Sequence, residues 1–427
     1  MAMFHIRKFR SVKIFKENKM KRKYLLITIL SLLIIAALFV ACAPATAPAT
    51  APAEAAPAKE EVAAEPEKGP ILIGMDMPVT GNDAVEGLNI LHGAELYIEE
   101  INSAGGILGH QIKLVIADNV CDSAVGISAL RKVIEVDKVH ATMGSVCSSV
   151  TLAVMPILEE TKTLSLDVAS TNKTITELAG PAGGNIWKFR LNLSDILLDT
   201  AFSKYIDQNS SRVAAMVTNT DFGRSSLENF QNILGNKIIA TEYFEYGDAD
   251  FRPALTRIKQ LNPDSILIFA GYPESTKIVA QMYELGMDLQ IYGRGTVVGP
   301  EAISLTPEEA MPLFEGAMQV STWSANPEAS DFIDKWMKKY GEGPGQDNGM
   351  GYYGMQVLIE GIKNCGKITG DLQVDRACIR DGLSKVDIEI AGLGHVKFDD
   401  HNQAHFPMFV NVVENGKVVV KERIASE

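Results

Sequence analysis

The stretch Gly144-Ser145-Val146-Cys147-Ser148-Ser149-Val150-Thr151 stands between a predicted strand and a predicted helix. The β-rich run before it spans 139–143, and apolar residues after it recur at the i, i+3, i+4, i+7 and i+8 spacing of a helix. Such a turn places hydroxyls and free backbone N–H groups at the positive end of a helix dipole, where a carboxylate binds. An ordinary serine N-cap gives the same pattern, so the stretch needs support from the rest of the chain.

Outward from this turn, strands alternate with helices in a regular order. Before it the pattern predicts strands near 71–75 and 112–118, with helices between them, and after it a strand near 163–167. The alternation starts again after Arg212, with strands near 213–218, 238–244, 265–270 and 289–292. This order predicts an α/β fold of two Rossmann-like lobes, each a parallel sheet covered by helices. Ligands of such sheets bind at the carboxyl ends of the strands. The last third predicts helices near 331–340 and 350–362 and a hairpin near 396–412.

The N-terminal residues have the order of an export signal. A basic run precedes an apolar run at 24–40, which ends at Ala41-Cys42. A cysteine directly after the cut site resembles the lipobox of bacterial lipoproteins, although Phe39 stands where leucine is usual. This predicts a lipoprotein signal peptide at 1–41, lipidation of Cys42, and a protein held at the outer face of the cell membrane or in the periplasm. A transmembrane anchor is the alternative, and Met20 is an alternative start.

Composition separates a tether from the folded part of the chain. Residues 42–68 are rich in Ala, Pro, Thr and Glu and have almost no large apolar residue, which predicts a disordered tether. The whole chain has a formal net charge of −13, and without residues 1–41 the net charge becomes −21. This balance argues against nucleic acid as a partner, because nucleic-acid binding needs a basic surface.

Four cysteines follow Cys42, and an even number in an exported protein suggests two disulfides. Order along the chain favours Cys121–Cys147 and Cys365–Cys378, although four cysteines allow three pairings. Buried free thiols are the alternative.

Several short motifs together resemble the leucine/isoleucine/valine-binding proteins, which are solute receptors of ABC importers with the type I periplasmic-binding fold. They are the stretches 93–109, 118–124, 147–151, 169–172, 221–223, 250–251 and 271–272. The resemblance covers nearly all of 69–427 and implies three crossings between the lobes. It assigns 70–190 and 320–393 to lobe one, and 191–319 and 394–427 to lobe two. It also implies hinge closure over a small ligand, delivery to a membrane permease, and no cofactor.

The resemblance also implies which residues touch the ligand. In the family, lobe one binds the α-carboxylate, here through Ser148, the backbone of Ala169 and Ser170, and the Thr171 hydroxyl. Lobe two closes with aromatic side chains, and these correspond to Phe222 and Tyr272. Core packing is the alternative role for both rings.

Two departures from the family concern the charge in the site. The family's amino-acid binders place an acidic residue after the strand at 289–292, where this chain has Gly293-Arg294-Gly295-Thr296. Where the family has an aromatic residue in the first loop, this chain has Glu86. Either Glu86 or Glu274 supplies the missing charge, or the ligand is a dicarboxylic or aromatic acid whose second carboxylate meets Arg294. A solvated Arg294 is the alternative.

No enzyme is indicated, because the seven histidines are scattered and neither G-x-S-x-G nor H-E-x-x-H occurs. Asp399, Asp400, His401 and His405 suggest a metal cluster, but their place between two β-rich runs favours a polar turn, so we expect no metal site. A ligand-sensing receptor subunit is the main alternative function, since the same fold serves signalling.

Overall fold

The computed structural model describes residues 68–425. The predicted signal peptide at 1–41, Cys42 and all but the last residue of the predicted tether lie outside the described residues. Within the described part, no helix combines the length and the apolar character needed to cross a bilayer.

Lobe one is built on a five-stranded parallel sheet in the order β2-β1-β3-β4-β5. The β1 side chains are mostly buried, as expected for a strand with helices on both faces. The strands are β1 (Ile71–Met77), β2 (Ile112–Asp118), β3 (Ala141–Gly144), β4 (Ser165–Asp167) and β5 (Lys188–Arg190). The helical segments between them are α2 (Ala84–Ser103), α3 (Ser123–Arg131), η1 (Lys132–Val136), α4 (Ser148–Thr161), α5 (Lys173–Leu178) and α6 (Gly180–Gly183).

Lobe two is built on a seven-stranded sheet in the order β14-β13-β10-β9-β8-β6-β7, in which β13 and β14 are antiparallel to their neighbours. Its strands are β6 (Val213–Thr218), β7 (Ile238–Phe244), β8 (Ser265–Ala270), β9 (Gln290–Gly295), β10 (Met318–Ser321), β13 (Met408–Glu414) and β14 (Lys417–Ile424). Its helical segments are α7 (Asp195–Asn209), α8 (Asp221–Leu234), η2 (Gly235–Lys237), α9 (Arg252–Gln260), α10 (Tyr272–Glu284), α11 (Pro300–Leu305) and η3 (Glu308–Phe314). The two sheets confirm the predicted α/β class with two lobes.

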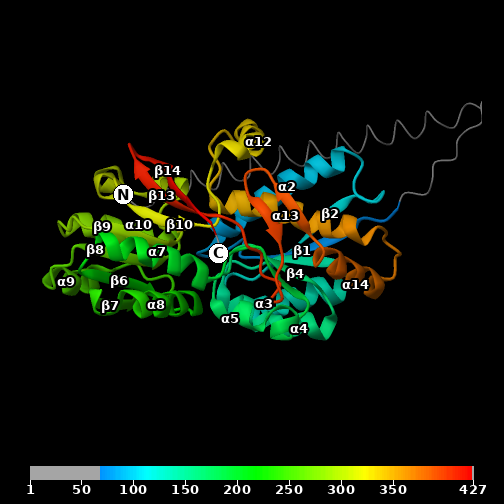
Figure 1. Cartoon of the computed structure of the whole chain (residues 1–427), viewed down its shortest axis with the longest axis horizontal. Coiled ribbons are helices and arrows are strands. Elements are labelled where there is room, and N and C mark those ends of the chain that lie inside the picture. Colours follow the sequence, from blue (N-terminus) through cyan, green and yellow to red (C-terminus); the bar gives the residue numbers. More distant parts are fainter. Residues whose placement is uncertain (1–67, 426–427) are drawn as a thin grey trace, which may run out of the picture. The chain divides into compact units, whose positions relative to one another are not determined.

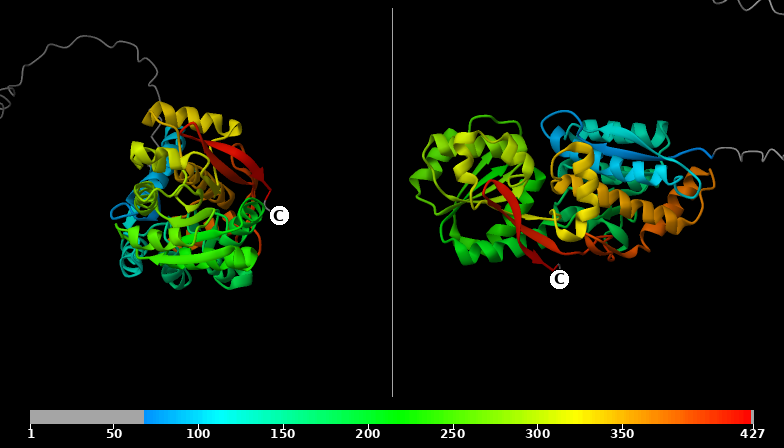
Figure 2. Two further views of the ribbon diagram at one scale, coloured as in Figure 1. Left: turned by 90° about the vertical axis from the view of Figure 1, so that its left-hand side faces the viewer. Right: turned by 90° about the horizontal axis from the view of Figure 1, so that it is seen from above.

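After β10 the chain returns to lobe one. The returning segments are η4 (Pro327–Ala329), α12 (Ser330–Tyr340), α13 (Gln346–Cys365), α14 (Leu372–Leu383), β11 (Asp387–Ile390) and β12 (Gly394–Lys397). Helix α13 packs against both α2 and α14, so segments far apart in the sequence lie side by side (Figures 1 and 2).

The predicted hairpin at 396–412 is wrong. Strand β12 pairs with β11 in a separate two-stranded sheet, whereas β13 pairs with β10 and β14. Between β12 and β13, the backbone of Gln403 forms an isolated β-bridge with that of Arg190. The ring of Phe398 packs on the ring of Phe189, with centroids 5.2 Å apart. These contacts favour a third crossing after Ala404 rather than at Gly394. Strand periodicity predicted two strands here but carries no information about their partners.

Helices α2 and α13 approach closely because glycines face the contact. A Cβ atom at Gly93 would lie 2.1 Å from the carbonyl oxygen of Asn348, and one at Gly351 would lie 2.0 Å from that of Ile90. No side chain fits at either position without moving the helices apart. The contact therefore fixes the first turn of α13 beside the first turns of α2.

We predict that Gly351→Ala lowers the free energy of unfolding by about 1–3 kcal/mol, because the added methyl group overlaps the α2 backbone. Alanine is otherwise the better helix former by about 1 kcal/mol, so a loss of stability identifies the steric contact. Urea denaturation of the variant measures it. Gly343→Ala is the control, since nothing lies within 4 Å of a Cβ atom there; equal stability of both variants would contradict the prediction.

Candidate ligand-binding site

A cavity of about 210 Å³ lies between the carboxyl ends of the strands of the two lobes. Of the residues predicted to touch a ligand, it brings together Ser148, Ala169, Thr171, Phe222, Glu86 and Arg294. It is also lined by residues that the sequence analysis did not select, among them Asp83, Ser149, Asn192, Thr218, Tyr246, Thr322 and Asp347. Ser170 and Tyr272 are not among the lining residues.

One wall of the cavity is the N-terminus of α4. The N-cap residue Cys147 has extended backbone angles, and its side chain caps no helix N–H group. Ser148 and Ser149, the first two helical residues, both line the cavity. The Ser148 hydroxyl accepts a hydrogen bond from the Asn172 backbone N–H at 3.3 Å and is 3% exposed. An uncapped helix N-terminus with two hydroxyls suits a carboxylate, because the first N–H groups have no partner within the helix.

The loop after β4 supplies the second part of this wall. Thr171 lines the cavity, and its hydroxyl lies beside the Asp195 carboxylate. Ser170 faces inward: its hydroxyl donates to the Ser145 carbonyl at 2.7 Å, and its backbone N–H donates to Asp167 at 3.0 Å. Arg190 holds the loop by donating to the Ser170 carbonyl at 2.6 Å. The arrangement therefore gives Ser170 a role in shaping the loop.

On lobe two, the two predicted aromatic residues differ in position. Phe222 lines the cavity. Tyr272 is buried behind the cavity wall, where its hydroxyl donates to Glu301 Oε2 and Asp347 Oδ2, both at 3.2 Å. Burial and these neighbouring carboxylates raise the pKa of the Tyr272 hydroxyl. Tyr272 therefore acts on the site through Asp347.

Arg294 lies at the cavity but already has two anionic partners. Its Nε donates to Asp199 at 2.5 Å and its Nη2 donates to Asp195 at 2.9 Å, and all three side chains are buried. The guanidinium carbon also lies 5.7 Å from the centre of the Phe222 ring. Because both aspartates are hydrogen-bonded to the guanidinium, Arg294 is already paired within the protein before any ligand binds. Burial is the main cause that raises the pKa of Asp199, to about 7.

We predict that Arg294→Gln destabilises the ligand-free protein by about 3–5 kcal/mol at pH 8, because two buried aspartates lose their charge partner. The loss is smaller at pH 5, where protonation neutralises Asp199, whose pKa is about 7. Thermal unfolding at both pH values measures this. Arg224→Gln, which changes an exposed arginine on α8, is the control. An unchanged melting temperature would contradict the prediction and would indicate that Arg294 is needed only for ligand binding.

The opposite part of the cavity is acidic. Asp83 is the N-cap residue of α2, Glu86 lies in the first turn of α2, and Asp347 lies in the first turn of α13. All three line the cavity. Burial is the main cause that raises the pKa of Glu86, followed by the charges of Asp347, Asp83, Glu274 and Glu301, the last two of which lie behind the lining residues. Burial followed by the charge of Glu301 raises the pKa of Asp347 to about 8, and burial raises that of Asp83 to about 6.

We predict that Asp347→Asn stabilises the ligand-free protein at pH 8 by roughly 1 kcal/mol or more. The folded protein keeps the Asp347 proton up to about pH 8, whereas the unfolded chain releases it near 3.8, so wild-type stability falls as pH rises between these values. Asparagine does not ionise, so the variant lacks this loss of stability with rising pH. Melting temperatures from pH 5 to pH 8 measure it, with the exposed Asp334→Asn as control; parallel curves for wild type and Asp347→Asn would contradict it.

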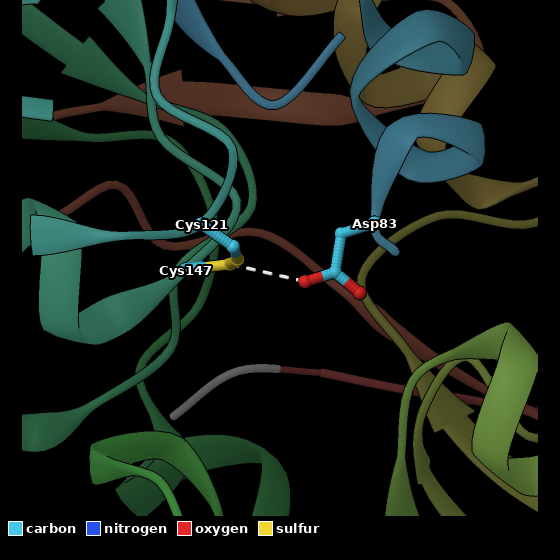
Figure 3. Close-up of side chains that lie close together, drawn as sticks. All are labelled: Asp83, Cys121 and Cys147. Carbon is cyan, nitrogen blue, oxygen red and sulfur yellow. Dashed lines mark hydrogen bonds between the residues drawn. A yellow bond between two sulfur atoms is a disulfide. The ribbon is translucent and has the colours of Figure 1, made fainter. Parts of the chain in front are cut away.

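Both predicted disulfides are present in the structure. Cys121–Cys147 joins the loop after β2 to the N-terminus of α4, and Cys365–Cys378 joins α13 to α14. Asp83 points toward the first pair, with its Oδ2 3.3 Å from Cys147 Sγ (Figure 3). These three side chains lie close enough to hold a metal ion. Disulfide sulfurs are not thiolates, however, so the oxidised pair does not provide the ligands that a metal site needs.

The stretch around Asp399 is a polar turn, as predicted. Asp399 accepts hydrogen bonds from the backbone N–H groups of His401 and Gln403, and its Oδ2 lies 2.9 Å from His405 Nε2. None of these residues lines the cavity.

Comparison with known proteins agrees with the fold. A periplasmic binding protein family model matches residues 70–417. The Leu/Ile/Val-binding protein homolog 1 of Brucella suis biovar 1 is 28% identical over 349 residues, which cover 80% of this chain and 89% of that protein. The chain therefore belongs to the periplasmic binding protein family, whose members bind solutes and are not enzymes.

Two solved structures illustrate the range of ligands found on this fold. The branched-chain amino acid transporter substrate-binding protein LivJ from Streptococcus pneumoniae, in complex with isoleucine, is 26% identical with a TM-score of 0.73 over 83% of this chain and 99% of that chain. An ABC transporter solute-binding protein from R. palustris, in complex with benzoate, is 19% identical with a TM-score of 0.75 over 84% of this chain and 97% of that chain. At 19% identity, the similarity to the R. palustris protein concerns the fold alone.

Proposed function

We propose that this chain is the extracytoplasmic receptor of an ABC importer and captures an amino acid between its lobes. Export by the signal at 1–41 and lipid attachment at Cys42 would hold it at the membrane, where a permease accepts the ligand. The observation that carries the proposal is the cavity wall at α4, where a helix N-terminus without a side-chain cap meets the hydroxyls of Ser148 and Thr171. Membership of the family and the isoleucine complex of LivJ support the same role.

The charge of the cavity favours an amino acid over a dicarboxylic acid. The α4 wall offers neutral donors for one carboxylate. Arg294 is neutralised by Asp195 and Asp199, which leaves no cation for a second one. The acidic group absent from 293–296 has replacements in Asp83 and Glu86, which line the cavity and suit an ammonium group. A dicarboxylate would bring a second negative charge into this acidic environment.

Hinge closure is the mechanism that the crossings support. Asn192, on the first crossing, hydrogen-bonds to Thr322 on the second, and Gln403 near the third donates to the Asn192 carbonyl at 3.0 Å. Asn192 and Thr322 also line the cavity. A ligand that contacts them touches the hinge directly, so it favours the closed arrangement through contacts that the open one lacks.

We predict that Ser148→Ala and Thr171→Ala each weaken amino-acid binding roughly 10–100-fold, since a hydrogen bond to a charged group contributes about 1.5–3 kcal/mol. Isothermal titration with the best ligand from an amino-acid panel, found by thermal shift, measures the change. Ser128→Ala is the control, because its exposed hydroxyl bonds only to its own helix. Unchanged affinity in both site variants, with folded protein, would refute the carboxylate site.

A further inference from the structure

We infer that the ligand carries a second positive charge, so that the site receives a basic amino acid such as arginine or lysine. This inference rests on the proposed function, because it assigns the ligand's carboxylate to the α4 wall and its side-chain cation to the acidic wall formed by Asp83, Glu86 and Asp347. It deepens that function by naming the class of substrate.

The first argument is a count of charges. A single α-ammonium group balances one of the three carboxylates that line the cavity. Arg294, the one basic residue among the cavity-lining residues in 68–425, is already paired with Asp195 and Asp199. A branched-chain ligand would therefore leave the other carboxyl groups with neutral partners alone, whereas a ligand with a cationic side chain supplies a charged one.

The second argument is that the partners of the acidic wall are neutral. Asp347 and Glu301 share the Tyr272 hydroxyl at 3.2 Å, and the other Glu301 oxygen accepts from the Asn89 amide at 2.8 Å. The Asp83 carboxylate lies beside the hydroxyl of Tyr246 and a disulfide sulfur. Asp83, Glu86 and Asp347 line the cavity. Within residues 68–425, the neighbouring charges that shift their pKa values most are those of other acidic side chains.

The third argument is an unpartnered buried carboxylate at the same place. Glu274 is 1% exposed, its Oε1 accepts from the Gly247 backbone N–H at 3.0 Å, and its Oε2 has no hydrogen-bond partner in the described part of the chain. A Cβ atom at Gly271, a cavity-lining residue, would lie 3.0 Å from Asp83 Oδ1 and 3.5 Å from Glu274 Oε2. Carboxylate oxygens from the two lobes thus approach each other at Gly271, one from a lining residue and one from a residue behind the cavity wall. A buried, unpaired acceptor of this kind costs free energy unless a donor reaches it.

The fourth argument is that the acidic wall departs from the pattern of the family that the sequence resembles. The position that the resemblance assigns to an aromatic residue in the first loop is Glu86, and the first turn of α13 brings Asp347 beside it through the close α2–α13 contact. An apolar ligand side chain gains nothing from two carboxylates, because their desolvation is unfavourable without a cation. An ammonium or guanidinium group forms charge-assisted hydrogen bonds with them.

The decisive experiment compares matched ligands by isothermal titration with the wild-type protein. L-arginine and L-citrulline have nearly the same shape, but only arginine has a charged side chain; L-lysine and L-norleucine form a second pair. We expect arginine or lysine to bind at least tenfold more tightly than its neutral counterpart. Equal affinity within both pairs, or tighter binding of leucine than of arginine and lysine, would overturn the inference.

Variants of the acidic wall test which residues recognise the positive charge on the ligand's side chain. Asp347→Asn should weaken arginine binding at least tenfold and leave citrulline binding within about twofold. Glu86→Gln should weaken arginine binding more than citrulline binding, because Glu86 also serves the α-ammonium group that both ligands carry. Asp334→Asn, which removes an exposed carboxylate on α12, should change neither. Loss of affinity for both ligands in equal proportion would indicate a structural effect and overturn the assignment of these residues. The unfolding curves of each variant verify that it is folded.

The pH dependence gives an independent readout. Asp347 is faced by Tyr272 from α10, Glu301 from α11 and Glu86 from α2, while Arg294 lines the same cavity. With its pKa raised to about 8, Asp347 is mostly protonated at pH 6.5, and a bound cation expels that proton. Arginine affinity should therefore rise from pH 6.5 to pH 8, with proton release seen as a dependence on buffer ionisation enthalpy. Citrulline should show neither effect, and arginine binding without pH dependence would contradict the mechanism.

Agmatine, which is arginine without the carboxylate, separates this inference from the proposed function. If both hold, agmatine binds at least tenfold more weakly than arginine, and Ser148→Ala weakens arginine but not agmatine. If agmatine and arginine bind equally, the carboxylate site fails while the cation site stands. If citrulline and arginine bind equally and Ser148→Ala weakens both, the cation site fails while the carboxylate site stands.

Discussion

The close contact between α2 and α13 is the constraint on which the site depends. Glycines at 93 and 351 allow backbone to meet backbone, and this brings a helix from the last quarter of the chain onto the first helix of lobe one. The first turns of both helices then open into the same cavity. Glu86 and Asp347 therefore line the same cavity, and the charge of Asp347 acts on Glu86. The packing of two helices therefore determines the electrostatic character of a cavity that neither helix forms alone.

The cavity that results has two chemically different walls. The α4 wall presents neutral donors at the positive end of a helix dipole, which attract a negative group without adding a full charge. The α2–α13 wall presents carboxylates with raised pKa values, which accept either protons or a cation. Because Arg294 is neutralised by its own aspartates, nothing cancels this polarity. Under the proposed function, such a cavity would orient a zwitterionic ligand by its charges.

The sequence predicted the parts of this structure that depend on local pattern. Buried parallel strands are continuous apolar runs, so the alternation of strands and helices and the two-lobe class could be predicted. The turn at Ser148 could be predicted because it joins a strand to a helix. What the sequence could not show depends on tertiary direction: the pairing of β12 and the inward hydrogen bonds of Ser170 and Tyr272 follow from partners distant in sequence. Asp347 lacked any local signal, since an acidic residue in a first helical turn is common.

Asn192 explains how binding and closure are linked in one residue. Its side chain bonds to the Ala169 carbonyl in the α4-side loop and to Thr322 on the second crossing, while its backbone carbonyl accepts from Gln403 near the third. The three crossings are therefore joined where the loop that would hold the carboxylate begins. A carboxylate that orders this loop also orders the hinge, because both share the same hydrogen bonds. Under the proposed mechanism a cation on the α2–α13 wall would add a complementary effect, because Asp83 lies close to Glu274 of lobe two and a positive charge near both would offset the repulsion between them.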